Sequence, residues 1–224
     1  HIHLADLDVI EGRLIRAMRG LSTAKRCLAN SGLSYGNEVE VIEIIELAIL
    51  YERGEFKKVR ENSARLRESL LKGDSWSELF LQLTRISVLS LYFTKGFQAA
   101  QEELEIFQAD YVRRHAERAS TIDILSGMIW RLEWNTNEAE LYINSLIYSN
   151  INSAIGSILF SDQQIIFNEK NDLKYFSPRG KIIEELQIAH SASGKKRRDA
   201  LERAFRNALK ENQIAPFLEN RDTF

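Results

Sequence analysis

The chain has 224 residues, long enough to bury the core of one large domain or of two small ones. Its net charge is −2 and its pI is about 6.2, whereas a general nucleic-acid binder is usually strongly basic. The single cysteine, Cys27, excludes an intrachain disulfide, and no apolar run approaches the ~20 residues of a membrane span.

The first twenty residues do not form a secretory signal peptide, because Asp6, Asp8 and Glu11 interrupt the apolar ones. Together with the lone cysteine, this predicts a cytoplasmic protein. The sequence begins at His1, and its first methionine is Met18. We therefore expect an excised part of a longer protein, with other modules outside this sequence.

The composition favours helices from the start of the chain. Residues 1–177 contain no proline, and helix-forming Leu, Ile, Glu, Lys, Arg and Ala are abundant. No segment alternates as a half-buried strand would. The first apolar residues follow helical spacing on one face: Leu7, Ile10, Leu14 and Met18. The sequence predicts an all-α fold.

A helical-hairpin pattern recurs along the chain. Each segment opens with an aliphatic pair at i and i+3: Leu7 with Ile10, Ile42 with Ile45, Leu83 with Ile86, Ile122 with Leu125, Ile183 with Leu186. A small or β-branched residue follows 17 positions after the first member: Ala24, Val59, Ala100, Ala139, Ala200. The intervening segments carry turn-forming residues: "RGLST", "RGEFKK", "TKGFQA", "NTNEA" and "SGKKRRD".

This pattern predicts stacked hairpins, because a small residue suits a close helix crossing and one hairpin cannot bury its apolar face alone. We expect a single domain with an α-α superhelix; an irregular helical bundle is the alternative. The expected parts are repeats near 4–31, 38–72, 76–112 and 116–150, an insertion at 151–180, a last repeat at 181–212 and a tail at 213–224.

The hairpin pattern resembles the tetratricopeptide repeat. Repeats near 40 residues also resemble the sensor domain of the large ATP-binding LuxR-type transcription activators, the family of the maltose-regulon activator. The end of the chain carries this resemblance. Its residues Phe217, Leu218 and Glu219 align with the family's closing Phe-Leu-acid signature, while Leu201, Ala204 and Ala208 match helix positions before it.

The resemblance implies an ATP-binding module before the array and a promoter-binding helix-turn-helix after it. This sequence has no G-x-x-x-x-G-K-[ST] loop, and seven residues after Phe217 are too few for a helix-turn-helix. We therefore expect no cofactor in this part, and ATP and DNA only in the full-length protein. The resemblance further implies that the array senses an inducer or a regulatory protein and controls self-association.

No catalytic or metal-binding motif is found, so we expect no enzyme activity. The four histidines, His1, His3, His115 and His190, show no ligand spacing with Cys27. His190 falls seven residues after Ile183, on the expected buried stripe, which favours a core histidine.

By analogy with tetratricopeptide arrays, the first helix of each hairpin lines a concave face. The residue after the first aliphatic anchor is acidic in four of the five segments, which predicts an acidic ladder for a cationic ligand or basic partner. An ordinary solvated helix face is the alternative. Trp130 joins the candidates because it pairs with Trp134 at i, i+4, although such pairs also build hairpin cores. The candidate ligand-binding residues are Asp8, Glu43, Thr84, Asp123, Trp130 and Glu184.

The basic stretch 194–220 invites a comparison between DNA binding and hairpin packing. Leu201, Ala204, Phe205, Ala208 and Leu209 form an apolar face, and acidic residues interleave the cations. We therefore expect a last repeat helix packed on 181–192, with Lys195–Arg198 in the loop before it.

For the chain as a whole, the alternative to a sensor domain is a general protein–protein scaffold or a peptide-pheromone receptor.

Overall fold

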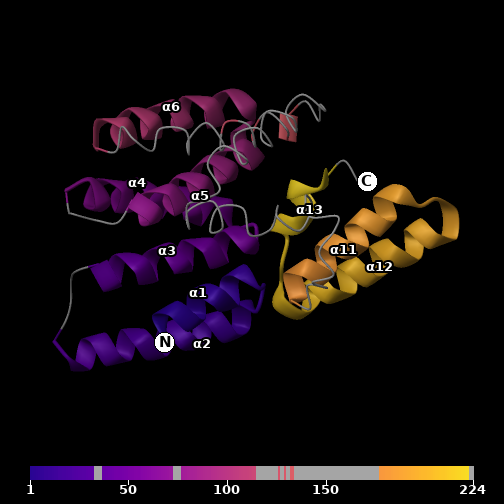
Figure 1. The fold of residues 1–224 in the computed structure, drawn as a ribbon, viewed down its shortest axis with the longest axis horizontal. Coiled ribbons are helices and arrows are strands. Elements are labelled where there is room, and N and C mark those ends of the chain that lie inside the picture. Colours follow the sequence, from indigo (N-terminus) through magenta and orange to yellow (C-terminus); the bar gives the residue numbers. More distant parts are fainter. Residues whose placement is uncertain are drawn as a thin grey trace, which may run out of the picture. The chain divides into compact units, whose positions relative to one another are not determined.

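The computed structural model describes residues 1–32, 37–72, 77–114, 126, 129, 132, 133 and 177–221. Over these residues the regular elements are helices and none is a strand, which confirms the all-α prediction (Figure 1). The superhelical path stays a prediction. The expected repeat at 116–150 and the insertion up to residue 176 lie essentially outside the described residues. The chain divides into two compact units, His1–Glu55 with Asn168–Phe224, and Phe56–Phe167.

The first unit combines the two ends of the sequence. Within it, α1 packs on α2, α3 contacts both, α11 pairs with α12, and α13 contacts α11 and α3 (Figure 1). The helices are α1 (Ile2–Ile10), α2 (Leu14–Asn30), α3 (Asn37–Glu52), α11 (Pro178–Ser191), α12 (Gly194–Glu211) and α13 (Ala215–Glu219). The helices from the end of the sequence, α11–α13, therefore belong to the same compact unit as α1–α3, and α13 contacts α3 directly.

The first turn lies around Gly12, not in the expected "RGLST" segment. Gly12 has φ +78°, a left-handed conformation that suits glycine. Gly20, within "RGLST", instead lies inside α2, where an added Cβ would stand 3.3 Å from the Cβ of Ala5. The absence of a side chain at residue 20 thus allows α1 and α2 to approach closely. Because of the turn at Gly12, the single apolar face expected across residues 7–18 is divided between two helices.

The aliphatic anchors are buried on α3, α5 and α11 but not on α1. Ile42, Ile45, Leu83, Ile86, Ile183 and Leu186 are all buried. In α1 the buried residues are Ala5, Asp8 and Val9, while Leu7 is 53% exposed. The expected register of the first helix is therefore wrong by about one residue, because the early turn rotates a different face of α1 toward α2 and α3.

The hairpin of α11 and α12 packs through small residues. Ile182 and Leu186 on α11 meet Ala204 and Ala208 on α12, and Ala200 is buried on the same stripe. Alanines at i, i+4 and i+8 let the helix axes approach closely. The expected face was therefore partly wrong: Phe205 is 50% and Leu209 is 79% exposed.

His190 is also exposed, contrary to the core position expected for it. The buried positions of α11 follow Ile182, Leu186 and Ala189, so the stripe passes beside residue 190. In addition, α11 begins at Pro178, within the expected insertion and three residues before the expected last repeat.

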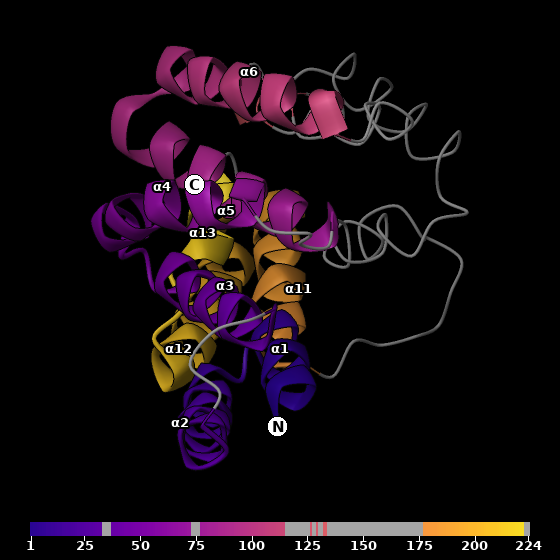
Figure 2. The ribbon, with the colours of Figure 1, turned by 90° about the vertical axis from the view of Figure 1, so that its left-hand side faces the viewer.

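The second unit contains α4 (Phe56–Lys72), α5 (Ser77–Lys95) and α6 (Phe97–Arg114). Helix α5 packs on both α4 and α6 (Figure 2). An aromatic group lies in its core, since the ring of Phe80 is 5.3 Å from that of Phe107 and 5.7 Å from that of Tyr111. Across the described residues, no helix combines the length and apolar character that a membrane span requires.

Candidate functional site

Two of the six candidate ligand-binding residues are directed into the interior. Asp8 is buried on α1, and Thr84 is fully buried on α5. The Thr84 hydroxyl donates a hydrogen bond to the carbonyl of Phe80, 2.7 Å away and one turn earlier. In this conformation neither side chain offers an exposed group to a ligand.

The other four candidates fall into two groups. Glu43 is partly exposed on α3, and Glu184 is exposed on α11. Asp123 and Trp130 lie outside the described residues. The structure therefore leaves Glu43 and Glu184 as the described members of the acidic ladder that solvent reaches, and a ligand role for any of the six stays a prediction.

Asp8 has a local partner set that explains its burial. Its carboxylate accepts a hydrogen bond from Nε of Arg13 at 2.8 Å and lies 3.1 Å from Nε of Arg16. The backbone N–H of Arg13 also donates to the Asp8 carbonyl at 2.7 Å. A buried carboxylate needs such compensation, so Asp8 stabilises the turn between α1 and α2.

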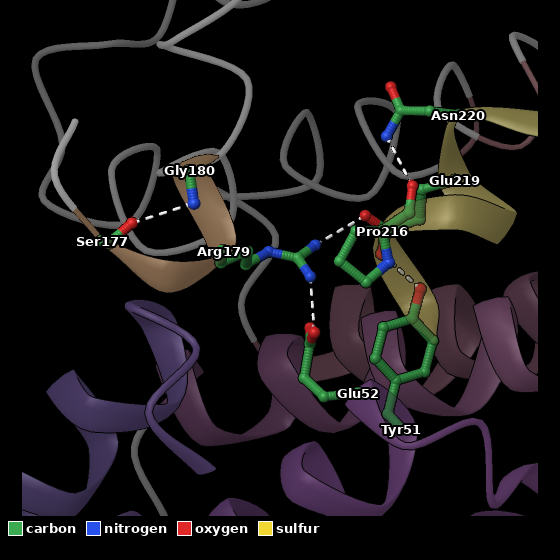
Figure 3. Close-up of polar contacts among 8 residues, drawn as sticks. All are labelled: Tyr51, Glu52, Ser177, Arg179, Gly180, Pro216, Glu219 and Asn220. Carbon is green, nitrogen blue, oxygen red and sulfur yellow. Dashed lines mark hydrogen bonds and ion pairs between the residues drawn. The ribbon is translucent and has the colours of Figure 1, made fainter. Parts of the chain in front are cut away.

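The main buried polar cluster of the first unit surrounds Arg179, and we call it the Arg179 cluster: Arg179, Glu52, Glu219 and Tyr51 (Figure 3). The Arg179 side chain is 2% exposed. It donates to Oε2 of Glu52 at 2.5 Å and to Oε2 of Glu219 at 2.6 Å. One cation on α11 thus joins α3, which is more than a hundred residues earlier in the sequence, to α13.

Local sequence places Arg179 at a well-defined helix start. Ser177 is the N-cap residue, and its side-chain oxygen accepts a hydrogen bond from the N–H of Gly180 at 3.0 Å. Pro178 follows in the first helical position, where its missing N–H costs nothing. The dipeptide Ser177-Pro178 is a recognisable helix-start signal, so the sequence contained the means to place the Arg179 backbone, although not its partners.

Glu219 of the closing signature has a structural role. Besides Arg179, its carboxylate accepts a hydrogen bond from the Tyr51 hydroxyl at 2.5 Å (Figure 3). The ring of Phe217, two residues earlier, packs on the α11–α12 core and stacks on Phe205, with centroids 4.7 Å apart and an interplanar angle of 9°. Phe217 and Glu219 therefore attach α13 to its neighbouring helices through one apolar and one charged contact.

Two backbone contacts complete this closure. The N–H of Arg179 donates to the carbonyl of Glu11 at 3.2 Å, and the N–H of Ile214 donates to the carbonyl of Glu52 at 2.7 Å. At Gly12, an added Cβ would stand 2.4 Å from the side-chain nitrogen of Gln213 and 2.8 Å from the Cβ of Arg179. The turn after α1 can therefore contact Gln213 and Arg179 only because residue 12 has no side chain.

The chemistry of the Arg179 cluster is that of a structural anchor. Both terminal nitrogens of the guanidinium already face carboxylates, so its charge is neutralised within the fold. Among the described residues, no group of three or more His, Cys, Asp or Glu side chains is placed to hold a metal ion. No protein-family model, curated protein or solved structure matches this chain.

Proposed function

We propose that the chain is the signal-receiving domain of a transcription regulator of the ATP-binding LuxR type. In this role it binds an inducer or a regulatory protein in the cytoplasm and controls self-association, without catalysing a reaction itself. ATP binding and promoter binding belong to other modules of the full-length protein.

The closing signature carries this proposal. Phe217 and Glu219, which align with the family pattern, are the residues that attach α13 to the hairpin α11–α12 and to α3. A signature that positions the end of a helical array suits a domain that must pass a change in its packing to whatever follows. The helical-hairpin architecture supports the same proposal, because such arrays present extended binding surfaces.

Reading the parent gene tests the family assignment. A phosphate-binding loop encoded upstream and a helix-turn-helix encoded downstream, in the same reading frame, are the expected result. A gene that encodes neither module contradicts the LuxR-type assignment and leaves a general helical scaffold.

Thermal-shift screening of metabolites against this domain tests the sensing role. A ligand at 100 times its dissociation constant adds about 2.7 kcal/mol to the free energy of unfolding. For a domain of this size, that raises the melting temperature by roughly 5–10 °C. We expect Glu43→Gln or Glu184→Gln to reduce the shift, and Glu38→Gln, an exposed site on the same helix as Glu43, to leave it unchanged.

A further inference from the structure

The outer face of α12 contradicts the usual charge preference of a helix. The helix begins at Gly194, so Lys195, Lys196 and Arg197 lie in its first turn and Arg198 follows directly, contrary to the loop expected for these residues. The first turn contains no acidic residue, and the N-cap Ser193 makes no side-chain hydrogen bond. Cations at a helix N-terminus face the positive end of the helix dipole and also repel one another.

Three of these cations have no acidic partner within the described part of the chain. The cations further along α12 are engaged: Arg203 donates to both carboxylate oxygens of Glu185 on α11, at 2.7 and 2.8 Å. Lys195, Lys196 and Arg198, in contrast, are exposed and form no ion pair with any described residue. The fold therefore holds positive charge where its own helix disfavours it and does not use that charge internally.

An apolar ridge runs along the same outer face. With 100° of rotation per residue, Arg198, Phe205 and Leu209 point within about 40° of one another. Leu209 is 79% exposed, and Phe205 keeps half of its surface in solvent while its ring stacks on Phe217. The stacking holds the Phe205 ring in a fixed orientation, so the ridge is preorganised.

We propose that this face, formed by Lys195, Arg198, Phe205 and Leu209, is a docking surface for an acidic amphipathic helix of a partner protein. The apolar side of such a helix covers Phe205 and Leu209, and its flanking carboxylates meet Lys195 and Arg198. These carboxylates also offset the unfavourable interaction of the cations with the helix dipole.

The composition of the face favours a peptide over a nucleic acid or a membrane. An exposed Leu209 offers nucleic-acid phosphates neither a hydrogen bond nor a charge, whereas it can pack against the apolar side of a peptide helix. Two apolar side chains are too few to anchor α12 in a bilayer, because the remaining apolar residues of the helix are directed into the hairpin. This surface includes none of the six candidate ligand-binding residues, so the proposal does not depend on the function proposed above.

Fluorescence anisotropy on the full 224-residue chain tests the proposal. The probe is a fluorescein-labelled peptide of about 18 residues, with leucines along one helical face and glutamates on both flanks. The comparison probes are the same peptide with lysine in place of glutamate, a DNA duplex of about 20 base pairs, and phosphatidylcholine–phosphatidylglycerol vesicles. We expect saturable binding of the acidic peptide and weaker binding of the other three probes.

Matched variants locate the site. Arg198→Glu and Leu209→Ala should each weaken peptide binding by about five- to tenfold, while the circular dichroism spectrum stays unchanged. Lys57→Glu reverses a charge of 89% exposure on α4 and should have no effect. The proposal is overturned if the acidic peptide does not bind, if DNA or vesicles bind more tightly, or if Lys57→Glu weakens binding as much as Arg198→Glu.

Discussion

Replacing Arg179 by methionine should lower the free energy of unfolding of the first unit by several kcal/mol. The substitution retains much of the side-chain volume but removes a cation that is 2% exposed and donates to two carboxylates. Glu52, itself buried, then loses its counter-charge, and Glu219 retains the bond from Tyr51. Breaking a buried ion pair by removing one partner costs about 3–5 kcal/mol, because the remaining charge is uncompensated.

Urea unfolding followed by circular dichroism measures this effect. With a denaturant slope of about 2 kcal/mol per molar, a loss of about 4 kcal/mol lowers the unfolding midpoint by roughly 2 M. The double variant Arg179→Met with Glu52→Gln should recover part of the loss, since the amide removes the buried charge that Arg179 balances. As a matched control, Arg203→Met removes a half-exposed arginine from a bidentate pair with Glu185 and should cost only about 1 kcal/mol, a much smaller shift of the midpoint.

The reasoning is refuted if Arg179→Met and Arg203→Met shift the midpoint equally, or if Glu52→Gln gives no recovery in the Arg179→Met background. Arg179→Lys adds a graded test. Lysine retains the charge but cannot face two carboxylates with a planar fork, so its stability should fall between those of the native protein and Arg179→Met.

Three further predictions follow from single sites. Gly12→Ala should lower the free energy of unfolding by more than the ~1–2 kcal/mol that a left-handed alanine costs, because its Cβ also clashes with Gln213 and Arg179. Gly32→Ala, which has open space around it, should cost only the ~1–2 kcal/mol of the left-handed backbone in the same urea titration. Asn212→Gly should leave stability unchanged or raise it by several tenths of a kcal/mol, since residue 212 caps α12 with φ +57°; a clear loss would contradict this. The hydrogen bond from Lys72 holds the pKa of Glu68 below its usual value. The stability this pair adds is therefore present above the unfolded pKa and is lost as pH falls through the folded pKa. Lys72→Met should raise the Glu68 pKa in a carboxyl NMR titration.

The helical secondary structure could be predicted from the sequence because it depends on local properties of the chain. The absence of proline before residue 178 and the spacing of aliphatic pairs such as Leu83 with Ile86 indicate helices wherever the chain is described. The turns at Gly54 and Gly96 likewise fall within the predicted segments. The first turn was misplaced because Gly12 and Gly20 are equally plausible turn residues in sequence, and only packing against Ala5 assigns residue 20 to a helix crossing.

The candidate site was less accessible to sequence reasoning. An acidic residue after an aliphatic anchor looks exposed on a helical wheel, yet Asp8 is buried because Arg13 and Arg16 neutralise it. The shift of about one residue in the register of α1 exchanges the exposed and buried positions. A wheel has no information about such partners, because they depend on where the neighbouring turn directs the chain.

The sequence by itself determined that the described part of this protein is helical and that helices adjacent in sequence pair, as α11 and α12 do. Tertiary structure alone decided that Glu219 binds a buried Arg179, and that Phe205 and Leu209 face outward. The physical reason is the difference in range. Helix propensity and turn formation act over a few residues, whereas ion pairs and packed faces depend on segments that the fold brings together from opposite ends of the sequence.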